Sequence, residues 1–231
     1  MPNEVNEMPK SLQSRKRQLV RDAIYDAAIE LFAKKGFDET TVEEVAEAAG
    51  ISRRSFFRYF ESKDDLLALN TVNCGQLLCT SVESLPASLS TLEVLRETAM
   101  AGIRFTESQK HIREVIEIAQ RSPNARQAHM SRLMEVEDRL VTSFAARTKH
   151  PTQYSQKSLL LAGLCLLINN AAIASWYLGE HKDLAAAVKS AEHNLAVIFC
   201  GESSPLSASK TSSGNKARAS IAASKPVRKK K

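Results

Sequence analysis

The chain has 231 residues, of which 43% are hydrophobic and 25% are charged. This composition provides enough apolar side chains for a packed core in one large domain or two small ones, so it excludes a wholly disordered chain. The net charge of +6 does not by itself indicate a nucleic-acid partner, because residues 201–231 carry 8 Lys and Arg against 1 acidic residue. Segments with the helical period of 3.6 dominate and alternating β-branched runs are absent, which predicts an all-α fold.

The first strong helix is predicted from Ser14 to the glycine at position 36. Residues 1–13 are polar and acidic and lack the apolar stretch of a signal peptide. We therefore expect them to be disordered and the protein to stay in the cytoplasm. Apolar residues recur at helical spacing from Val20 to Leu31, and Gly36, which follows two lysines, is typical of a helix end.

A second, short helix is predicted between Thr41 and Gly50. Thr41 is a typical N-cap residue, and Glu44, three residues later, completes a capping box. Gly50 ends the helix after barely two turns. A helix of this length is not stable alone, so it must pack against its neighbours.

The sequence "ISRRSFFRYF", residues 51–60, predicts a third helix with Ser52 as its N-cap. Two short helices joined by a turn that contains glycine are typical of a helix-turn-helix, whose second helix enters the major groove of DNA. At 100° per residue, Phe56 and Phe60 share one face, which we expect to face the core. The opposite face is polar and carries Arg54, Ser55 and Arg58.

The arginines of this helix have two interpretations. They form a solvated charged face, or they bind DNA, where a guanidinium group reaches O6 and N7 of guanine. The capped short helix before them and the shared turn favour DNA. Phe57 and Tyr59 lie on the flanks, where a ring packs on the domain and a phenol reaches a phosphate. Arg53 lies nearer the packed side, and only its position in the first turn indicates a DNA contact.

Residues 17–67 resemble the N-terminal DNA-binding domain of TetR/AcrR-type bacterial transcriptional regulators. The resemblance rests on "LFAKKGF" followed by "TTVEEVAEAAGISRRSFFRYFESKDDLL", in which the caps, glycines, aromatic pairs and lysine fall in register with the pattern of that family. It covers roughly the first third of the chain. One departure is Phe57, which stands where the family often has a tyrosine and has no hydroxyl group to donate.

The resemblance implies a helix-turn-helix over residues 41–60 and a set of DNA contacts. It assigns phosphate contacts to the backbone or hydroxyl of Thr41, to Tyr59 and to Lys63. The groove-facing first turn consists of Ser52, Arg53, Arg54 and Ser55. The predicted DNA-binding set is completed by Phe57 and Arg58. Independently, Ser62 is a predicted N-cap, and the free N–H groups of the helix that follows favour an anion beside Lys63.

The remaining sequence predicts further helices and a domain boundary near residue 62. The predicted helices span about 63–83, 91–107, 109–121, 124–147, 153–179 and 183–199. The predicted parts are a disordered start (1–13), the DNA-binding domain (14–62), an effector-binding and dimerisation domain (63–201) and a tail (202–231). The resemblance implies that the last two helices pack against their symmetry mates in a homodimer.

The apolar segment 158–179 has close to the length that spans a bilayer. Asn169 and Asn170 lie at its middle, and no basic cluster flanks it as a topology signal. These features favour a helix buried in a core or a subunit interface over a membrane span.

No enzyme activity, metal site or cofactor is expected. The histidines are scattered, and nothing resembles a catalytic triad or a phosphate-binding loop. The cysteines have neither a CxxC spacing nor a histidine at metal-ligand spacing, so we interpret them as small hydrophobic residues in the core. They are Cys74, Cys79, Cys165 and Cys200.

The resemblance also implies a mostly apolar pocket for a small-molecule effector between about residues 63 and 178. The candidate pocket residues are Met100, Phe105, Met130, Met134, Phe144 and Trp176. Each of them also has a plain interpretation as a core residue. A dimer sets two recognition helices about one turn of DNA apart and so selects a near-palindromic operator. An effector that favours another spacing releases the DNA, so the predicted function is that of a ligand-responsive repressor.

A second hypothesis is a DNA-binding protein of the same fold that ignores small molecules and acts in chromosome organisation. The tail rich in Ser, Ala and Lys is the feature that suggests it. The tail is expected to be disordered, either as a solvated terminus or as a cationic arm that adds nonspecific, salt-sensitive phosphate binding.

Overall fold

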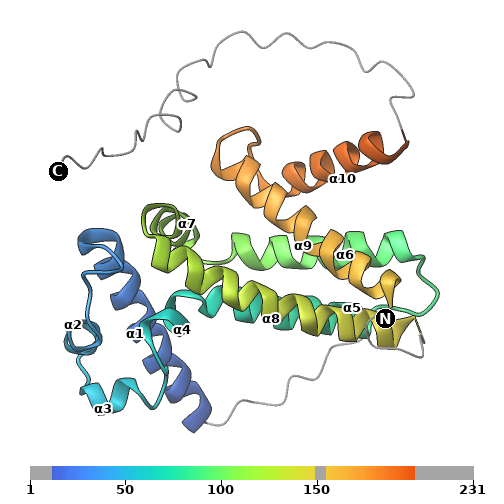
Figure 1. Ribbon diagram of the computed structural model, residues 1–231. Coiled ribbons are helices and arrows are strands. Elements are labelled where there is room, and N and C mark those ends of the chain that lie inside the picture. The colour runs from blue at the N-terminus through green and yellow to red at the C-terminus, as the bar shows by residue number, and fades with distance from the viewer. Residues whose placement is uncertain (1–11, 149–154, 201–231) are drawn as a thin grey trace, which may run out of the picture. The chain divides into compact units, whose positions relative to one another are not determined.

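The computed structural model describes residues 12–148 and 155–200, and every regular element within these ranges is a helix. The predicted all-α fold is confirmed. Its helices, shown in Figure 1, are α1 (Leu12–Lys35), α2 (Val42–Ala48), α3 (Arg53–Phe56), α4 (Lys63–Leu67), α5 (Leu69–Ser84), α6 (Thr91–Glu107), α7 (Ile112–Arg121), α8 (Pro123–Arg147), α9 (Gln156–Tyr177) and α10 (Leu184–Cys200). The predictions for residues 1–11 and for the basic tail lie outside the described residues.

The chain divides into two units, Met1–Asn194 and Leu195–Lys231. Helices α1 to α9 belong to the first unit. The second unit contains the last residues of α10. α1 begins at Leu12, earlier than the predicted start at Ser14.

Side-chain caps set the starts of the three short helices. In each case the hydroxyl group of the N-cap residue accepts a hydrogen bond from the backbone N–H three residues later. The caps are Thr41, Ser52 and Ser62, with distances of 3.2, 3.2 and 3.1 Å. All three predicted caps are confirmed, and they satisfy backbone donors that a short helix would otherwise leave unpaired.

Two glycines end the first two helices as predicted. Gly36 has a φ of 103° and donates its N–H to the carbonyl of Phe32. Gly50 has a φ of 67°, and the next residue, Ile51, donates to the carbonyl of Ala46 at 2.9 Å. These left-handed conformations favour glycine, because a Cβ atom would be strained there.

The short helices share one hydrophobic core, which we call the N-terminal core. Phe56 and Phe60 are 0% and 4% exposed, so the predicted core face of the third helix is confirmed. Ile118 from α7 and Ala125 from α8 complete the same core. Its buried members are Ile24, Tyr25, Ala28, Ile29, Phe32, Phe37, Val45, Ala46, Phe56, Phe60, Leu66, Leu67, Ile118 and Ala125. Helices far along the chain therefore help to hold the first four.

A second core lies among α5, α6, α8 and α9. α5 and α9 each pack against both α6 and α8 (Figure 1). The approach of α5 to α8 depends on Gly75, because a Cβ atom there would lie 2.3 Å from a methyl carbon of Val136. The buried side chains of this core include Leu78, Leu140 and Phe144.

α9 is long and apolar enough to cross a membrane by length and composition, the one such helix among the described residues. Leu161, Cys165 and Leu166 on this helix are buried in the second core. The helix is therefore a core helix on one side, as the sequence favoured. Leu160 and Leu167 remain exposed on another side.

Replacing Phe60 by Ala is expected to lower the free energy of unfolding by about 3–5 kcal/mol, because the change removes a buried ring and leaves a cavity. Phe57 is the matched control, since its side chain is 45% exposed. Phe57→Ala is expected to cost less than about 1 kcal/mol. Denaturant unfolding followed by circular dichroism measures both values. Equal losses would contradict the assignment of the two rings to inner and outer faces.

Candidate nucleic-acid interface and internal cavity

The third helix presents three exposed arginines, Arg53, Arg54 and Arg58. Its α-helical part, Arg53–Phe56, is a single turn and so is shorter than the three turns predicted. The chain continues with the tighter i to i−3 bonding of a 3₁₀ turn, because Arg58 and Tyr59 donate to the carbonyls three residues earlier. Phe60 still reaches the core, so the inner and outer faces are preserved.

Arg53 differs from its predicted position. The sequence placed it nearer the packed side, which is wrong: its side chain is 64% exposed, and its Nε lies 2.7 Å from Oε1 of Glu43. Because Arg53 is the first residue of α3, its side chain extends from the helix end toward α2 and not into the core. An exposed ion pair of this kind is worth at most about 1 kcal/mol, so Glu43 competes weakly with a phosphate for Arg53.

An arginine side chain lies over each of the two flanking rings, Phe57 and Tyr59. The guanidinium carbon of Arg53 lies 5.4 Å from the centre of the Phe57 ring, and that of Arg58 lies 5.8 Å from the centre of the Tyr59 ring. Phe57 packs edge-on against Phe56, with ring centres 5.4 Å apart. Cation–π contacts of this kind restrict exposed arginines to fewer orientations.

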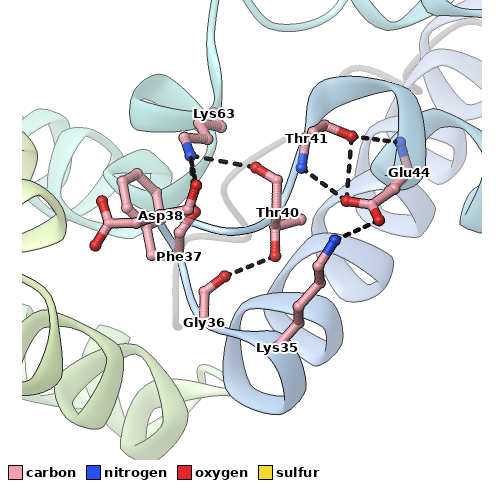
Figure 2. A network of polar contacts seen from close by, with 8 residues as sticks. All are labelled: Lys35, Gly36, Phe37, Asp38, Thr40, Thr41, Glu44 and Lys63. Carbon is pink, nitrogen blue, oxygen red and sulfur yellow. Dashed lines mark hydrogen bonds and ion pairs between the residues drawn. The ribbon is translucent and has the colours of Figure 1, made fainter.

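Figure 2 shows the network that fixes the start of α2. The hydroxyl and the backbone N–H of Thr41 both donate to Oε2 of Glu44, at 3.1 and 2.9 Å. Lys35 binds the other carboxylate oxygen. The ammonium group of Lys35, followed by the N–H of Thr41, lowers the pKa of Glu44 to about 2. The predicted capping box is confirmed, and it occupies both Thr41 donors that the resemblance assigned to phosphate.

Lys63 lies in the same network and points back into the turn between α1 and α2. Its Nζ donates to the carbonyls of Phe37, Asp38 and Thr40 at 2.7, 3.2 and 3.2 Å (Figure 2). A lysine ammonium group has three N–H donors, so these three bonds occupy all of them. The amino group also lies 4.6 Å from the centre of the Phe37 ring. In this conformation Lys63 holds the turn and has no donor left for the phosphate that the sequence predicted.

Polar contacts tie this turn to the junction of α7 and α8. The carboxylate of Asp38 accepts hydrogen bonds from Ser122 at 2.8 Å and from Asn124 at 2.7 Å. The bonds from Asn124 and Ser122 hold the pKa of Asp38 below its ordinary value. In α4, Asp65 pairs with Arg132 of α8.

A further contact joins α1 to the start of α7. Asp26 lies 2.9 Å from Nζ of Lys110 and 3.0 Å from Nε2 of His111. Burial alone would raise the pKa of Asp26, but Lys110 and His111 lower it overall. The first four helices are thus joined to α7 and α8 by polar contacts as well as by the N-terminal core.

A cavity of about 260 Å³ lies among α5, α6, α7, α8 and α9. Most of its surface is apolar, from side chains such as Leu78, Phe105, Ile112, Ile116, Leu133 and Val136. Among the predicted pocket residues, Phe105 lines it. The other candidates do not line it. Phe144 is buried in the second core, Met100 is half-buried, and Met130 and Met134 are 49% and 67% exposed. The ring centre of Trp176 lies 4.1 Å from the guanidinium carbon of Arg113.

Polar side chains also line the cavity. Thr71 Oγ1 lies 2.9 Å from Nδ1 of His129, which joins α5 to α8. Burial lowers the pKa of His129, so its ring is neutral near pH 7. Asn70 donates to the phenol oxygen of Tyr25 at 2.9 Å, which links the cavity wall to the N-terminal core.

Comparison with known proteins bears on both regions. Residues 24–69 match the family described as bacterial regulatory proteins, tetR family. The HTH-type transcriptional regulator TcmR from Streptomyces glaucescens is 26% identical over 183 residues, which cover 76% of this chain and 80% of TcmR. The HTH-type transcriptional regulator AcrR from Shigella flexneri is 31% identical over 105 residues, or 44% of this chain and 48% of AcrR. Residues 24–69 are thus similar to the DNA-binding domain of TetR/AcrR-type transcriptional regulators, and the two relatives support a regulator of that type.

A solved structure from Syntrophomonas wolfei, described as a TetR-family transcriptional regulator, superposes on this chain with a TM-score of 0.59. The match covers 82% of this chain and 97% of that one, at 16% sequence identity. At this identity the likeness concerns the fold alone.

Sequence reasoning missed several residues of this regulator. Asp38 was not predicted to join two regions, and Asn70, Thr71 and His129 were not predicted to line the cavity. The signal available was polar residues inside apolar runs, as in "LLALNTVNCG". That signal does not reveal which distant side chain each residue meets.

Replacing Lys63 by Met distinguishes its two roles. If Lys63 holds the turn, Lys63→Met lowers stability and DNA affinity, while the dependence of log affinity on log salt keeps its slope. If Lys63 binds a phosphate, the slope falls by about 0.9. The measurement is DNA binding over a salt series, on a duplex that the protein selects from a random library.

Arg58→Met is the matched control, because Arg58 is exposed on the third helix. We expect it to reduce the salt slope by about one phosphate contact and to leave stability nearly unchanged. A reduced slope with unchanged stability for Lys63→Met would restore the phosphate role of Lys63.

Proposed function

We propose that this regulator is a ligand-responsive repressor. It binds a near-palindromic operator as a homodimer in the cytoplasm and leaves the DNA when a small, largely apolar ligand fills the cavity. The observation that carries this proposal is the position of α7. Ile112 and Ile116 on this helix line the cavity, whereas Ile118 lies in the N-terminal core. A change on one side of α7 therefore bears directly on the helices that read DNA.

The proposed DNA-reading surface is the helix-turn-helix of residues 41–60. Arg54 and Arg58 are exposed and suit base edges in the major groove. Ser52 and Ser55 lie beside them, and Tyr59 offers a phenol to a phosphate. The first-turn position of Arg53 and the exposed ring of Phe57 add to this surface. Thr41 contributes by capping α2, whose position sets the turn that precedes α3.

The proposed dimer forms through α9 and α10. Leu159, Leu160 and Leu167 on α9 are exposed large apolar side chains, which a soluble protein tends to cover with a partner. A second copy of the same chain covers them by twofold symmetry, as most oligomers do. Such a dimer presents the third helix of each copy to one of two successive major grooves.

Ligand response requires unequal affinity for two conformations. A ligand between α5, α7 and α8 would shift α7 relative to α1, because Asp26 and Asp38 bind residues at the two ends of α7. The DNA-bound spacing of the third helices would then be disfavoured. The coupling is reciprocal, so operator DNA would weaken ligand binding by the same factor.

Replacing Arg54 by Ala is expected to cost roughly 1–3 kcal/mol on the selected operator and little on random DNA, if Arg54 reads a base. Arg121→Ala is the control, because Arg121 is an exposed arginine on α7 with a side chain that is 73% exposed. Arg121→Ala should change neither the affinity for the selected operator nor the affinity for random DNA. Fluorescence anisotropy on both duplexes measures the difference.

Other outcomes of this experiment redirect the proposal. Equal losses on both duplexes would reassign Arg54 to the phosphate backbone. Selection that yields no near-palindromic site, or a monomer by sedimentation, would contradict the dimeric operator complex. If no compound of a metabolite panel weakens binding, the chain fits the alternative of a ligand-independent DNA-binding protein.

A further inference from the structure

The cavity lies along two helices that run in the same direction, and one polar pair of its wall marks the end where both helices start. Thr71 of α5 meets His129 of α8, and further along both helices Gly75 meets Val136. Residue numbers rise together on the two helices, so the polar pair lies toward the start of both. The apolar side chains Leu78 and Val136 lie toward the other end, where Asn169 of α9 also lines the cavity beside Leu78 and its buried Oδ1 accepts no hydrogen bond from the described residues.

The charge on the cavity wall is positive. Arg126 is the permanently charged residue among those that line it, and no acidic residue lines it. Nε and Nη2 of Arg126 donate to the carbonyls of Ala119 and Gln120 at 3.3 and 3.1 Å. These bonds hold the guanidinium at the end of α7 and leave some of its five N–H donors for another acceptor. Because Arg126 is exposed, a charged ligand group beside it stays partly hydrated.

The charge lies near the end of the cavity that carries the Thr71–His129 pair. Arg126 precedes His129 by three residues on α8, so the two side chains share a face of that helix. His129 is neutral and bonded to Thr71, so it offers hydrogen bonding without a second charge. One cation, one hydroxyl group and one neutral imidazole therefore line the cavity near the start of α8.

From this arrangement we propose that the cavity binds a mono-anionic amphiphile, with its carboxylate at Arg126 beside Thr71 and His129 and its apolar body between α5 and α8. The proposal rests on the ligand response proposed above and specifies the chemistry of the ligand. A cationic head would be repelled by Arg126 and find no acid. A neutral head would leave the guanidinium without an anionic partner.

The volume sets the length of the apolar body. A cavity of about 260 Å³ lies just below the usual volume of sites for drug-sized ligands, so it suits an unbranched chain of medium length. Each added methylene group should raise affinity roughly fourfold until the cavity is full. Beyond that length the gain should stop.

The test uses the full chain without DNA and three probes with the same tail: octanoate, octanol and octylammonium. Isothermal titration calorimetry should show octanoate binding roughly tenfold or more tightly than octanol, because a hydrogen bond to a charged group is stronger than a neutral one. Octylammonium should bind most weakly. Equal affinities for octanoate and octanol, tighter binding of octylammonium, or no binding by any probe would overturn the proposal.

Variants test the residues. Arg126→Gln should remove the preference for octanoate over octanol, and Arg126→Lys should keep part of it. Arg139→Gln is the matched control, because Arg139 is an exposed arginine of the same helix outside the cavity wall. If Arg126→Gln weakens octanoate and octanol equally, its effect is structural and the assignment fails.

The hydroxyl contribution has its own matched pair. Thr71→Val should weaken octanoate binding, whereas Thr98→Val removes a buried hydroxyl that lies away from the cavity and should not. Thermal unfolding of each variant establishes that it is folded. Equal effects of the two changes would remove Thr71 from the proposed site.

A last experiment tests the proposed ligand chemistry and the proposed ligand response separately. Octanoate is added to the complex with the selected duplex. Octanoate that binds through Arg126 but leaves the complex intact would contradict the ligand response, while the ligand chemistry would stand. Release by octanol or octylammonium, but not by octanoate, would support the response and overturn the ligand chemistry.

Discussion

The burial of Ile118 and Ala125 in the N-terminal core is the constraint on which the rest of this structure depends. α2, α3 and α4 are too short to be stable alone, so their positions come from the core that they share with α1. That core is completed by α7 and α8. The orientation of the exposed arginines on the third helix therefore depends on helices more than fifty residues further along the chain.

Polar contacts at both ends of α7 reinforce the packing of α7 against the N-terminal core. Asp26 holds the residues that precede α7, and Asp38 holds the turn that follows it. The main-chain carbonyl of Asp38 also accepts from Lys63, which fixes the turn before α2. One loop thus connects the cap of α2 to the junction of α7 and α8. Because packed cores move between discrete arrangements rather than deforming smoothly, a shift of α7 would reach α2 through this loop.

Features set by near neighbours were predictable from the sequence. The caps at Thr41, Ser52 and Ser62, the helix ends at Gly36 and Gly50, and the core face of Phe56 and Phe60 depend on residues a few positions away. Features set by distant partners were not. The contacts of Lys63 reach back more than twenty residues. The candidate effector residues show a related limit of sequence patterns: Phe105 lines the cavity, but Met130 and Met134 are exposed on α8, and the rotation of a helix that decides this is not set by near neighbours.

The joint between α7 and the N-terminal core is tested most directly by replacing Ile118 with Ala and measuring amide hydrogen exchange in the free protein. Ile118 belongs to that core and is not part of the cavity wall. The loss of a buried isoleucine should cost about 2–5 kcal/mol. We expect protection to fall in α1 and α2 as well as in α7, because one core holds all three. Reduced protection confined to α7, with α1 and α2 unchanged, would contradict the account.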